Sequence, residues 1–137
     1  MNINRIAGYL ERIRKVFTNV TKLIDALETF IVNKNDEKIT DYVRKIISYL
    51  HTLERVERKE SKWEKHIGLK ALAKEQERQK RDLELIERAI NKLLKKSQQG
   101  LPIGEDEELI RKLGEEFLKS LDEEISKLEQ LKRPTKL

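Results

Sequence analysis

The sequence predicts an all-α protein, an antiparallel up-down-up-down four-helix bundle with long helices. Apolar residues recur at alternating steps of three and four through four segments, which is the repeat of a helix with one buried face. Each segment is about 30 residues, or roughly 45 Å, long, and only short turns separate them. The net charge is +5 although 40% of the residues are charged, so opposite charges mostly cancel, which is atypical of a disordered chain. We therefore expect a single domain over residues 1–137.

The first predicted helix covers residues 4–32 and has two apolar rows. One row follows the three-and-four spacing without a break. The other repeats every seven residues beside it, so the apolar face is wider than a two-stranded coiled coil needs and suits a bundle core. This second row is Tyr9, Val16, Leu23 and Phe30. After it, Asn33, Asn35 and Asp36 predict a short turn whose side-chain oxygens cap the next helix.

Residues 36–67 and 69–98 form the middle two predicted helices. Gly68 is the only helix breaker between Asp36 and Gly100, and we place the turn there because glycine readily adopts the left-handed conformation that ends helices. The polar stretch 57–62 is an alternative turn site. Without a turn the helix would exceed 60 residues and reach about 90 Å.

A turn at Gly68 places two polar stretches opposite each other. Residues 57–62 and residues 74–79 both lack apolar side chains at most core-facing positions. We therefore expect a thin core at this end of the bundle, loose in the monomer or completed by another chain.

The last predicted helix covers residues 105–132. Gly100, Pro102 and Gly104 mark the loop before it. Its first residues, 105–108, are all acidic, which complements the positive end of the helix dipole. Residues 133–137 are expected to form a frayed tail.

The composition argues against most metal and covalent chemistry. There is no cysteine and there are only two histidines, so a disulfide scaffold, a cysteine-ligated zinc site and a cysteine nucleophile are excluded. A ferritin-like metal pair needs Glu-x-x-His, but Ser48 precedes His51 and Trp63 precedes His66 at that spacing. No glycine-rich phosphate loop is present. We expect a non-enzymatic protein with no catalytic residues, metal site or cofactor.

The chain shows no sign of membrane insertion or export. No apolar run approaches the roughly 18 residues of a membrane span, and charged residues interrupt the N-terminal segment as early as Arg5. We expect a location inside the cell, in the host cytoplasm, or in a virion, with no membrane partner.

A further row, Tyr42, Tyr49, Val56 and Trp63, repeats every seven residues in the second predicted helix. Together with the row in the first helix, it indicates a contact surface. One bundle does not readily bury three apolar rows per helix, and tyrosine and tryptophan are enriched at interface hot spots. A flank of the bundle's own core is the alternative interpretation. We predict a homodimer, most simply two-fold, or another protein partner. The candidate contacts are Tyr9, Val16, Tyr42, Tyr49, Val56 and Trp63.

The basic charge suggests a second possible function. Basic residues exceed acidic ones up to residue 104, whereas the last helix is acidic. Such a balance is compatible with nucleic-acid binding, although acidic residues interleave with most of the basic ones. The candidate basic patch is Arg5, Arg12, Lys15, Lys92, Lys95 and Lys96.

The chain, taken over its full length, resembles the small helical proteins of spindle-shaped viruses of hyperthermophilic archaea. The resemblance rests on size and on a composition rich in Lys, Glu, Arg and Ile without cysteine. In architecture the predicted bundle is similar to adhesion-type scaffold bundles such as the focal-adhesion-targeting domain, which implies protein–protein interaction through helix faces. No residue roles are carried over. The predicted function is therefore a non-enzymatic interaction module or scaffold. A basic nucleic-acid-binding accessory protein is the alternative, and a helical export chaperone, similar over residues 23–67, is the third.

Overall fold

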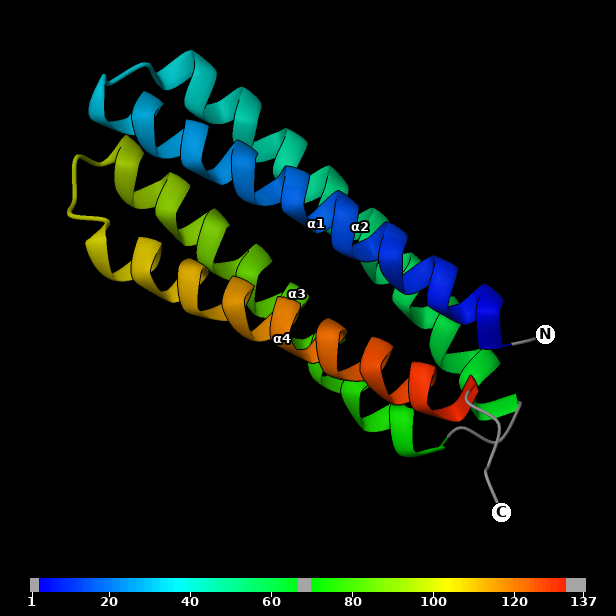
Figure 1. Cartoon of the computed structure of the whole chain (residues 1–137). Coiled ribbons are helices and arrows are strands. Elements are labelled where there is room, and N and C mark those ends of the chain that lie inside the picture. Colours follow the sequence, from blue (N-terminus) through cyan, green and yellow to red (C-terminus); the bar gives the residue numbers. More distant parts are fainter. Residues whose placement is uncertain (1–2, 67–69, 133–137) are drawn as a thin grey trace.

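The chain folds into four long α-helices in the computed structural model, which describes residues 3–66 and 70–132 (Figure 1). The helices are α1 (Ile3–Val32), α2 (Asp36–His66), α3 (Lys70–Gln98) and α4 (Gly104–Lys132). These bounds agree with the predicted ranges to within one residue wherever the chain is described. The predicted turn at Gly68 and the predicted frayed tail at 133–137 lie outside the described residues. The alternative turn at 57–62 is wrong, because α2 runs through those residues without a break.

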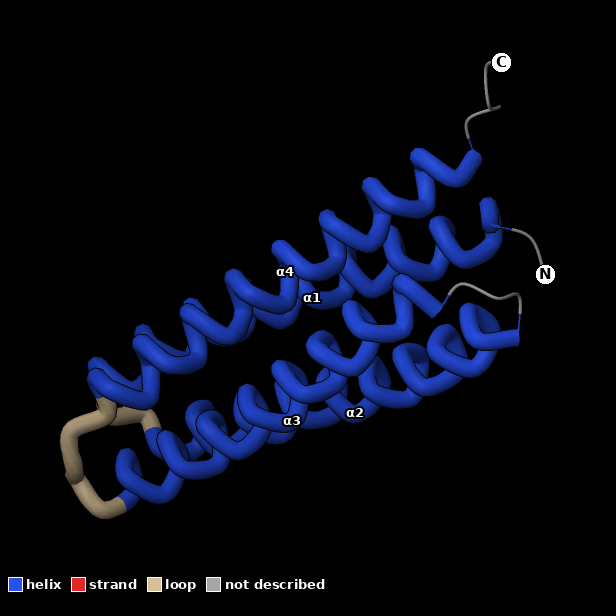
Figure 2. The backbone as a smooth tube through the Cα atoms, turned by 90° about the horizontal axis from the view of Figure 1, so that it is seen from below, coloured by secondary structure: helices blue, strands red, loops and turns tan. Residues whose placement is uncertain are grey.

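The helices form an antiparallel bundle in which each one packs against two neighbours. α1 lies between α2 and α4, and α3 lies between the same two helices on the other side (Figures 1 and 2). The start of α1 and the end of α4 lie at one end of the bundle, and the α1–α2 and α3–α4 connections lie together at the other. The predicted fold class is confirmed. None of the described helices is both long and apolar enough to cross a membrane.

The apolar row of each helix points into a shared core. Phe17 of α1 and Phe117 of α4 are fully buried, and their ring centroids are 4.4 Å apart. Gly114 lies one helical turn before Phe117 and faces the Phe17 ring. A small pocket of about 130 Å³ remains between α1 and α4 beside Gly114.

The α1–α2 turn closes α1 with a Schellman motif built on a lysine. Lys34 has a φ of 55°, in the left-handed region. The Asn35 amide donates to the Phe30 carbonyl and the Lys34 amide to the Ile31 carbonyl, which is the motif's hydrogen-bond pattern. The Asn35 side-chain oxygen accepts from the Lys38 amide at 3.3 Å. The predicted cap of the second helix is therefore confirmed.

The α3–α4 loop uses the same motif with glycine in the left-handed position. Gly100 has a φ of 69°, and the Leu101 amide donates to the Lys96 carbonyl at 2.9 Å. Glycine has no Cβ, so it adopts this conformation without the steric cost that a lysine carries. Asp106, in the first turn of α4, is buried and forms an ion pair with Lys96 at 2.9 Å.

Candidate functional site

The two seven-residue rows meet where α1 packs against α2. The ring of Phe30 packs edge-on against the ring of Tyr42, with centroids 4.8 Å apart. Because the helices are antiparallel, each step of seven residues back along α1 matches a step of seven forward along α2. From this register we infer that Leu23 lies opposite Tyr49 and Val16 opposite Val56. We call this stripe, made of Tyr9, Val16, Leu23, Phe30, Tyr42, Tyr49 and Val56, the α1–α2 seam.

Most of the seam is half-buried. Val16, Tyr42 and Val56 pack against the core while keeping part of their surface in solvent, and Tyr9 is also half-buried. Tyr49 is 44% exposed and is one of few large apolar residues so exposed in the described chain. The side chain of Trp63 lies outside the described residues. These side chains therefore pack against the core and also present part of their surface to solvent. Their role as partner contacts stays a prediction.

Basic side chains border the seam on both helices. On each helix, the residues four positions before and three positions after the seam residues form the neighbouring row. These residues are exposed cations or small or neutral residues, and none of them is acidic. The cations, which we call the basic strips, are Arg5 and Arg12 on α1 and Lys38, Lys45 and Lys59 on α2.

Three members of the basic strips lie over aromatic rings of the seam. The Arg12 guanidinium is 5.9 Å from the Tyr9 ring centroid. The Lys38 ammonium is 5.0 Å from that of Phe30, and the Lys45 ammonium is 5.1 Å from that of Tyr42. Such cation–π contacts each contribute about 0.5–1 kcal/mol at exposed sites. They place positive charge beside the aromatic rings of the seam, and the Lys45 ammonium is also 3.9 Å from a carboxylate oxygen of Asp41.

The opposite flank of α1 is different in character. It faces α4 through ion pairs, with Arg14 3.1 Å from Asp122 and Arg111 3.4 Å from Glu28. The apolar stripe is therefore on the α1–α2 side, while the α1–α4 side carries pairs of opposite charges.

The structure separates the predicted basic patch into two groups. Arg5, Arg12 and Lys15 lie on the N-terminal half of α1, whereas Lys92 and Lys95 lie near the end of α3, at the other end of the bundle (Figure 1). Lys96, beside them, is paired with Asp106. Only the α1 group lies on the same hairpin as the seam.

The two polar stretches do face each other, and they fill the core instead of thinning it. Glu60 of α2 and Gln76 and Gln79 of α3 are buried, together with Glu124 of α4. The Gln76 amide nitrogen is 2.8 Å from Glu60 Oε2 and 2.9 Å from Glu124 Oε2. Gln79 donates to the other oxygen of Glu124 at 2.8 Å. The core at this end is therefore not empty: polar side chains occupy the core-facing positions and are tied across three helices. Whether this end is loose in the monomer or completed by another chain stays a prediction.

A second set of polar contacts extends this polar layer toward the surface. Ser120 of α4 donates to Glu75 Oε2 at 2.7 Å, and Lys127 reaches the other oxygen of Glu75 at 3.4 Å. Lys127 thus supplies positive charge at the edge of the layer.

Burial disfavours the ionised form of two buried carboxyl groups, Glu60 and Asp82. It raises the pKa of Glu60 to about 8, with a smaller contribution from the nearby Glu124 charge, while the Gln76 hydrogen bond acts in the opposite direction. Burial, followed by the Glu116 charge, raises the pKa of Asp82 to about 6. The layer holds acceptors in excess of donors, and Glu60 Oε1 accepts no hydrogen bond from the described residues.

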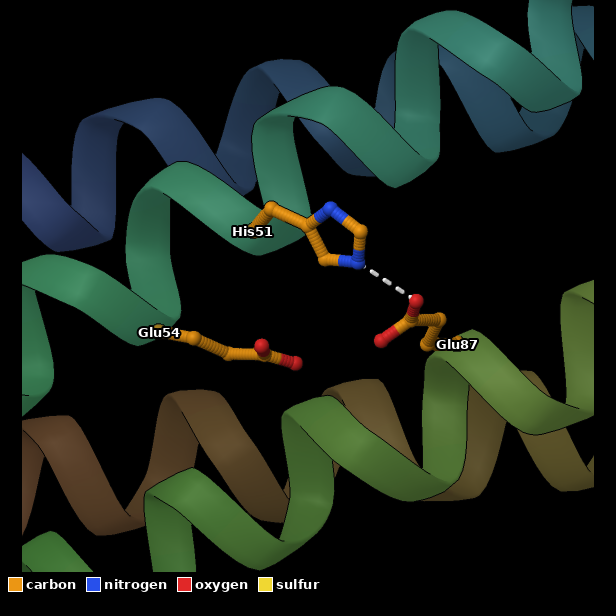
Figure 3. Close-up of side chains that lie close together, drawn as sticks. All are labelled: His51, Glu54 and Glu87. Carbon is orange, nitrogen blue, oxygen red and sulfur yellow. Dashed lines mark hydrogen bonds and ion pairs between the residues drawn. The ribbon is translucent and has the colours of Figure 1, made fainter.

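A third group of side chains joins α2 to α3 at mid-length. His51 and Glu54 project from successive turns of α2 toward Glu87 of α3 (Figure 3). The His51 Nε2 atom is 2.6 Å from a Glu87 carboxylate oxygen, and ligand atoms of all three residues lie within 4.8 Å of one another. Burial, then the neighbouring Glu87 charge, raises the pKa of Glu54, whereas His51 lowers it.

The buried polar layer and the His51 group differ in how far the sequence indicates them. The buried layer could be anticipated, since polar residues fall on core positions of both α2 and α3. The His51 group was missed because the Glu-x-x-His search reads one helix in one direction. His51 and Glu54 have the reverse order, His-x-x-Glu, and the third residue comes from another helix.

Comparison with known protein families, curated proteins and solved structures finds no match for this chain.

Proposed function

We propose that the chain is a non-enzymatic interaction module that binds an acidic amphipathic helix of a partner protein on its α1–α2 face. The observation that carries the proposal is the seam itself, an apolar stripe bordered on both sides by basic strips. An apolar anchor within a charged rim is the usual composition of a protein interface.

The charges on this face define the partner. A helix laid along the seam would set apolar anchors at i, i+3 or i+4, and i+7 against Tyr49 and its neighbours. Its flanking acidic residues would meet Arg12 and Lys45. Because both strips are basic, an acidic partner gains from both sides of the seam.

The same charges bear on self-association. A two-fold homodimer through the α1–α2 face would bring two sets of basic strips together, which costs free energy unless anions intervene. The homodimer stays a prediction that sedimentation equilibrium tests. For this face, charge complementarity favours a different, acidic chain.

Binding of a synthetic peptide tests the proposal. The probe is a fluorescent peptide of about 20 residues with leucine at helical three-and-four spacing and glutamate on its other faces. A scrambled peptide of the same composition is the control. We expect the patterned peptide to bind more tightly than the scrambled one, and Tyr49→Ser to weaken binding. Equal binding of the two peptides would contradict the proposed role of the seam.

Charge reversal locates the site. We expect Arg12→Glu and Lys45→Glu each to weaken binding of the patterned peptide at least about tenfold. Lys92→Glu, at the far end of α3, should leave the affinity for this peptide unchanged. Equal loss in all three variants would indicate unspecific attraction by net charge and would contradict the proposal. Circular dichroism checks that each variant remains helical.

Nucleic-acid binding is the second candidate, and the cation-covered aromatic rings of the seam favour it. Arginine, lysine and aromatic side chains also bind single strands by charge and stacking. Single-stranded DNA of about 20 nucleotides is therefore included in the same assay. If the DNA binds more tightly than the patterned peptide, and its affinity falls steeply with salt, this second function replaces the first.

A further inference from the structure

We propose that His51, Glu54 and Glu87 form a binding site for a divalent transition-metal ion, of which Zn²⁺ is the representative. The site lies between α2 and α3 (Figure 3), away from the α1–α2 seam, so it is independent of the proposed partner binding. It adds to the fold a position where an external ion can join two helices.

Binding of an ion needs only small rotations of these three side chains. Nε2 of His51 is 2.6 Å from a Glu87 oxygen, and all three ligand atoms lie within 4.8 Å of one another. A tetrahedral ion with ligands at about 2.0–2.1 Å holds them roughly 3.4 Å apart. The His51–Glu87 pair must therefore open slightly and Glu54 must approach. His51 and Glu54 share one face of α2 because they are three residues apart.

The ligand types select the class of metal. One imidazole nitrogen and two carboxylates match Zn²⁺ and similar ions. Ca²⁺ needs six to eight oxygen ligands, and Mg²⁺ keeps most of its waters, so three ligands including a nitrogen suit neither. The three side chains leave at least one coordination position for water.

The charges around the site support a cation, with moderate affinity. Glu54 and Glu87 bring two carboxylates together, and one oxygen of Glu54 is shielded from solvent. Glu84, on the next turn of α3, adds a further negative charge near Glu54. A cation relieves this repulsion.

Arginines on α2 oppose cation binding. Arg44 and Arg58 line the same open surface depression as His51 and Glu54. Arg55 also borders it, but its guanidinium donates to Thr52 at 3.3 Å. We therefore expect a dissociation constant in the micromolar range, because these positive charges offset part of the attraction.

Calorimetric titration of the full chain with Zn²⁺ tests the site. We expect about one ion per chain. His51→Ala and Glu87→Gln should each weaken binding at least about tenfold, because each removes one of only three ligands. His66→Ala removes the chain's other histidine and should leave the affinity unchanged. Ca²⁺ or Mg²⁺ at the same concentration should not compete.

Co²⁺ provides a second readout that does not depend on heat. It takes similar ligands to Zn²⁺, and its visible absorption reports its coordination. We expect Zn²⁺-displaceable bands with the wild type and with His66→Ala, and none with His51→Ala. Zn²⁺ binding weaker than about 1 mM, or binding lost in His66→Ala but kept in His51→Ala, would overturn the proposal. Circular dichroism verifies that the compared variants are folded.

Discussion

The side-chain amide of Gln76 lies 2.8 Å from a Glu60 carboxylate oxygen, across the α2–α3 interface and inside the core. Both side chains are almost completely buried. A carboxyl group in this position is stabilised in its neutral form, because ionisation would leave a charge in a medium of low dielectric constant. The stability of the bundle should therefore depend on pH through this pair.

We predict that the free energy of unfolding falls as pH rises from about 4.5 to about 8 through Glu60. Its pKa is 4.5 when unperturbed and about 8 when folded, so in this window the folded state binds more protons than the unfolded state. The contribution is complete below pH 4.5 and lost above 8. Its full size is on the order of a few kcal/mol, at about 1.4 kcal/mol per pKa unit.

Comparison with Glu60→Gln isolates this effect. The amide cannot ionise, so the variant should match the wild type near pH 4.5 and exceed its stability at pH 8 in urea unfolding. Glu129→Gln, at an exposed position of α4, removes a carboxylate without touching the polar layer and serves as the control. If the wild type and Glu60→Gln gave parallel stability curves over this range, the buried pair would not govern the pH dependence.

The two Schellman motifs predict opposite effects of matched substitutions. Lys34 and Gly100 occupy equivalent left-handed positions, with φ of 55° and 69°. Lys34→Gly should raise the free energy of unfolding by about 0.5–1 kcal/mol, because glycine removes the Cβ strain. Gly100→Ala should lower it by about 1 kcal/mol for the same reason. Chemical denaturation measures both; a stabilising Gly100→Ala would be inconsistent with this turn geometry.

Gly114 is predicted to be replaceable by alanine with a gain in stability. A Cβ there would lie 3.6 Å from the Phe17 ring, an ordinary van der Waals distance, beside the small α1–α4 pocket. Alanine favours the helix by about 0.8–1.0 kcal/mol over glycine, so Gly114→Ala should raise the melting temperature. Gly8→Ala, where nothing lies within 4 Å, reports helix propensity alone. A lower melting temperature for Gly114→Ala, combined with a higher one for Gly8→Ala, would contradict the packing described around Phe17.

The fold was predictable from sequence because its signals are periodic and local. The apolar spacing predicted the helices, Asn33, Asn35 and Asp36 predicted a capped turn before α2, and a turn at Gly68 placed the polar stretches 57–62 and 74–79 opposite each other. What the sequence pattern did not give was how that polar region is filled. A polar residue at a core position implies a thin core only if the side chain turns outward. Here the amide of Gln76 finds acceptors on two other helices, and this requires the three-dimensional arrangement.

For the candidate sites too, part of the arrangement was predictable from the sequence and part depends on how the helices pack. The seam follows from two seven-residue rows that the sequence displays, and the antiparallel hairpin makes them adjacent. The pairing of His51 with Glu87 depends on the rotation of α2 relative to α3, about which spacing within one helix carries no information. The basic residues of α1 and α3 look alike in sequence, but the topology places them at opposite ends of the bundle.

The central claim is that the α1–α2 face is the surface through which the chain acts. Amide chemical-shift mapping by NMR, during titration with the patterned acidic peptide, tests it most directly. We predict that the largest shifts fall on α1 and α2 around Tyr49, Val16 and Lys45, with α3 and α4 little changed. Shifts concentrated on α3 or α4, or spread evenly over the bundle, would contradict the claim.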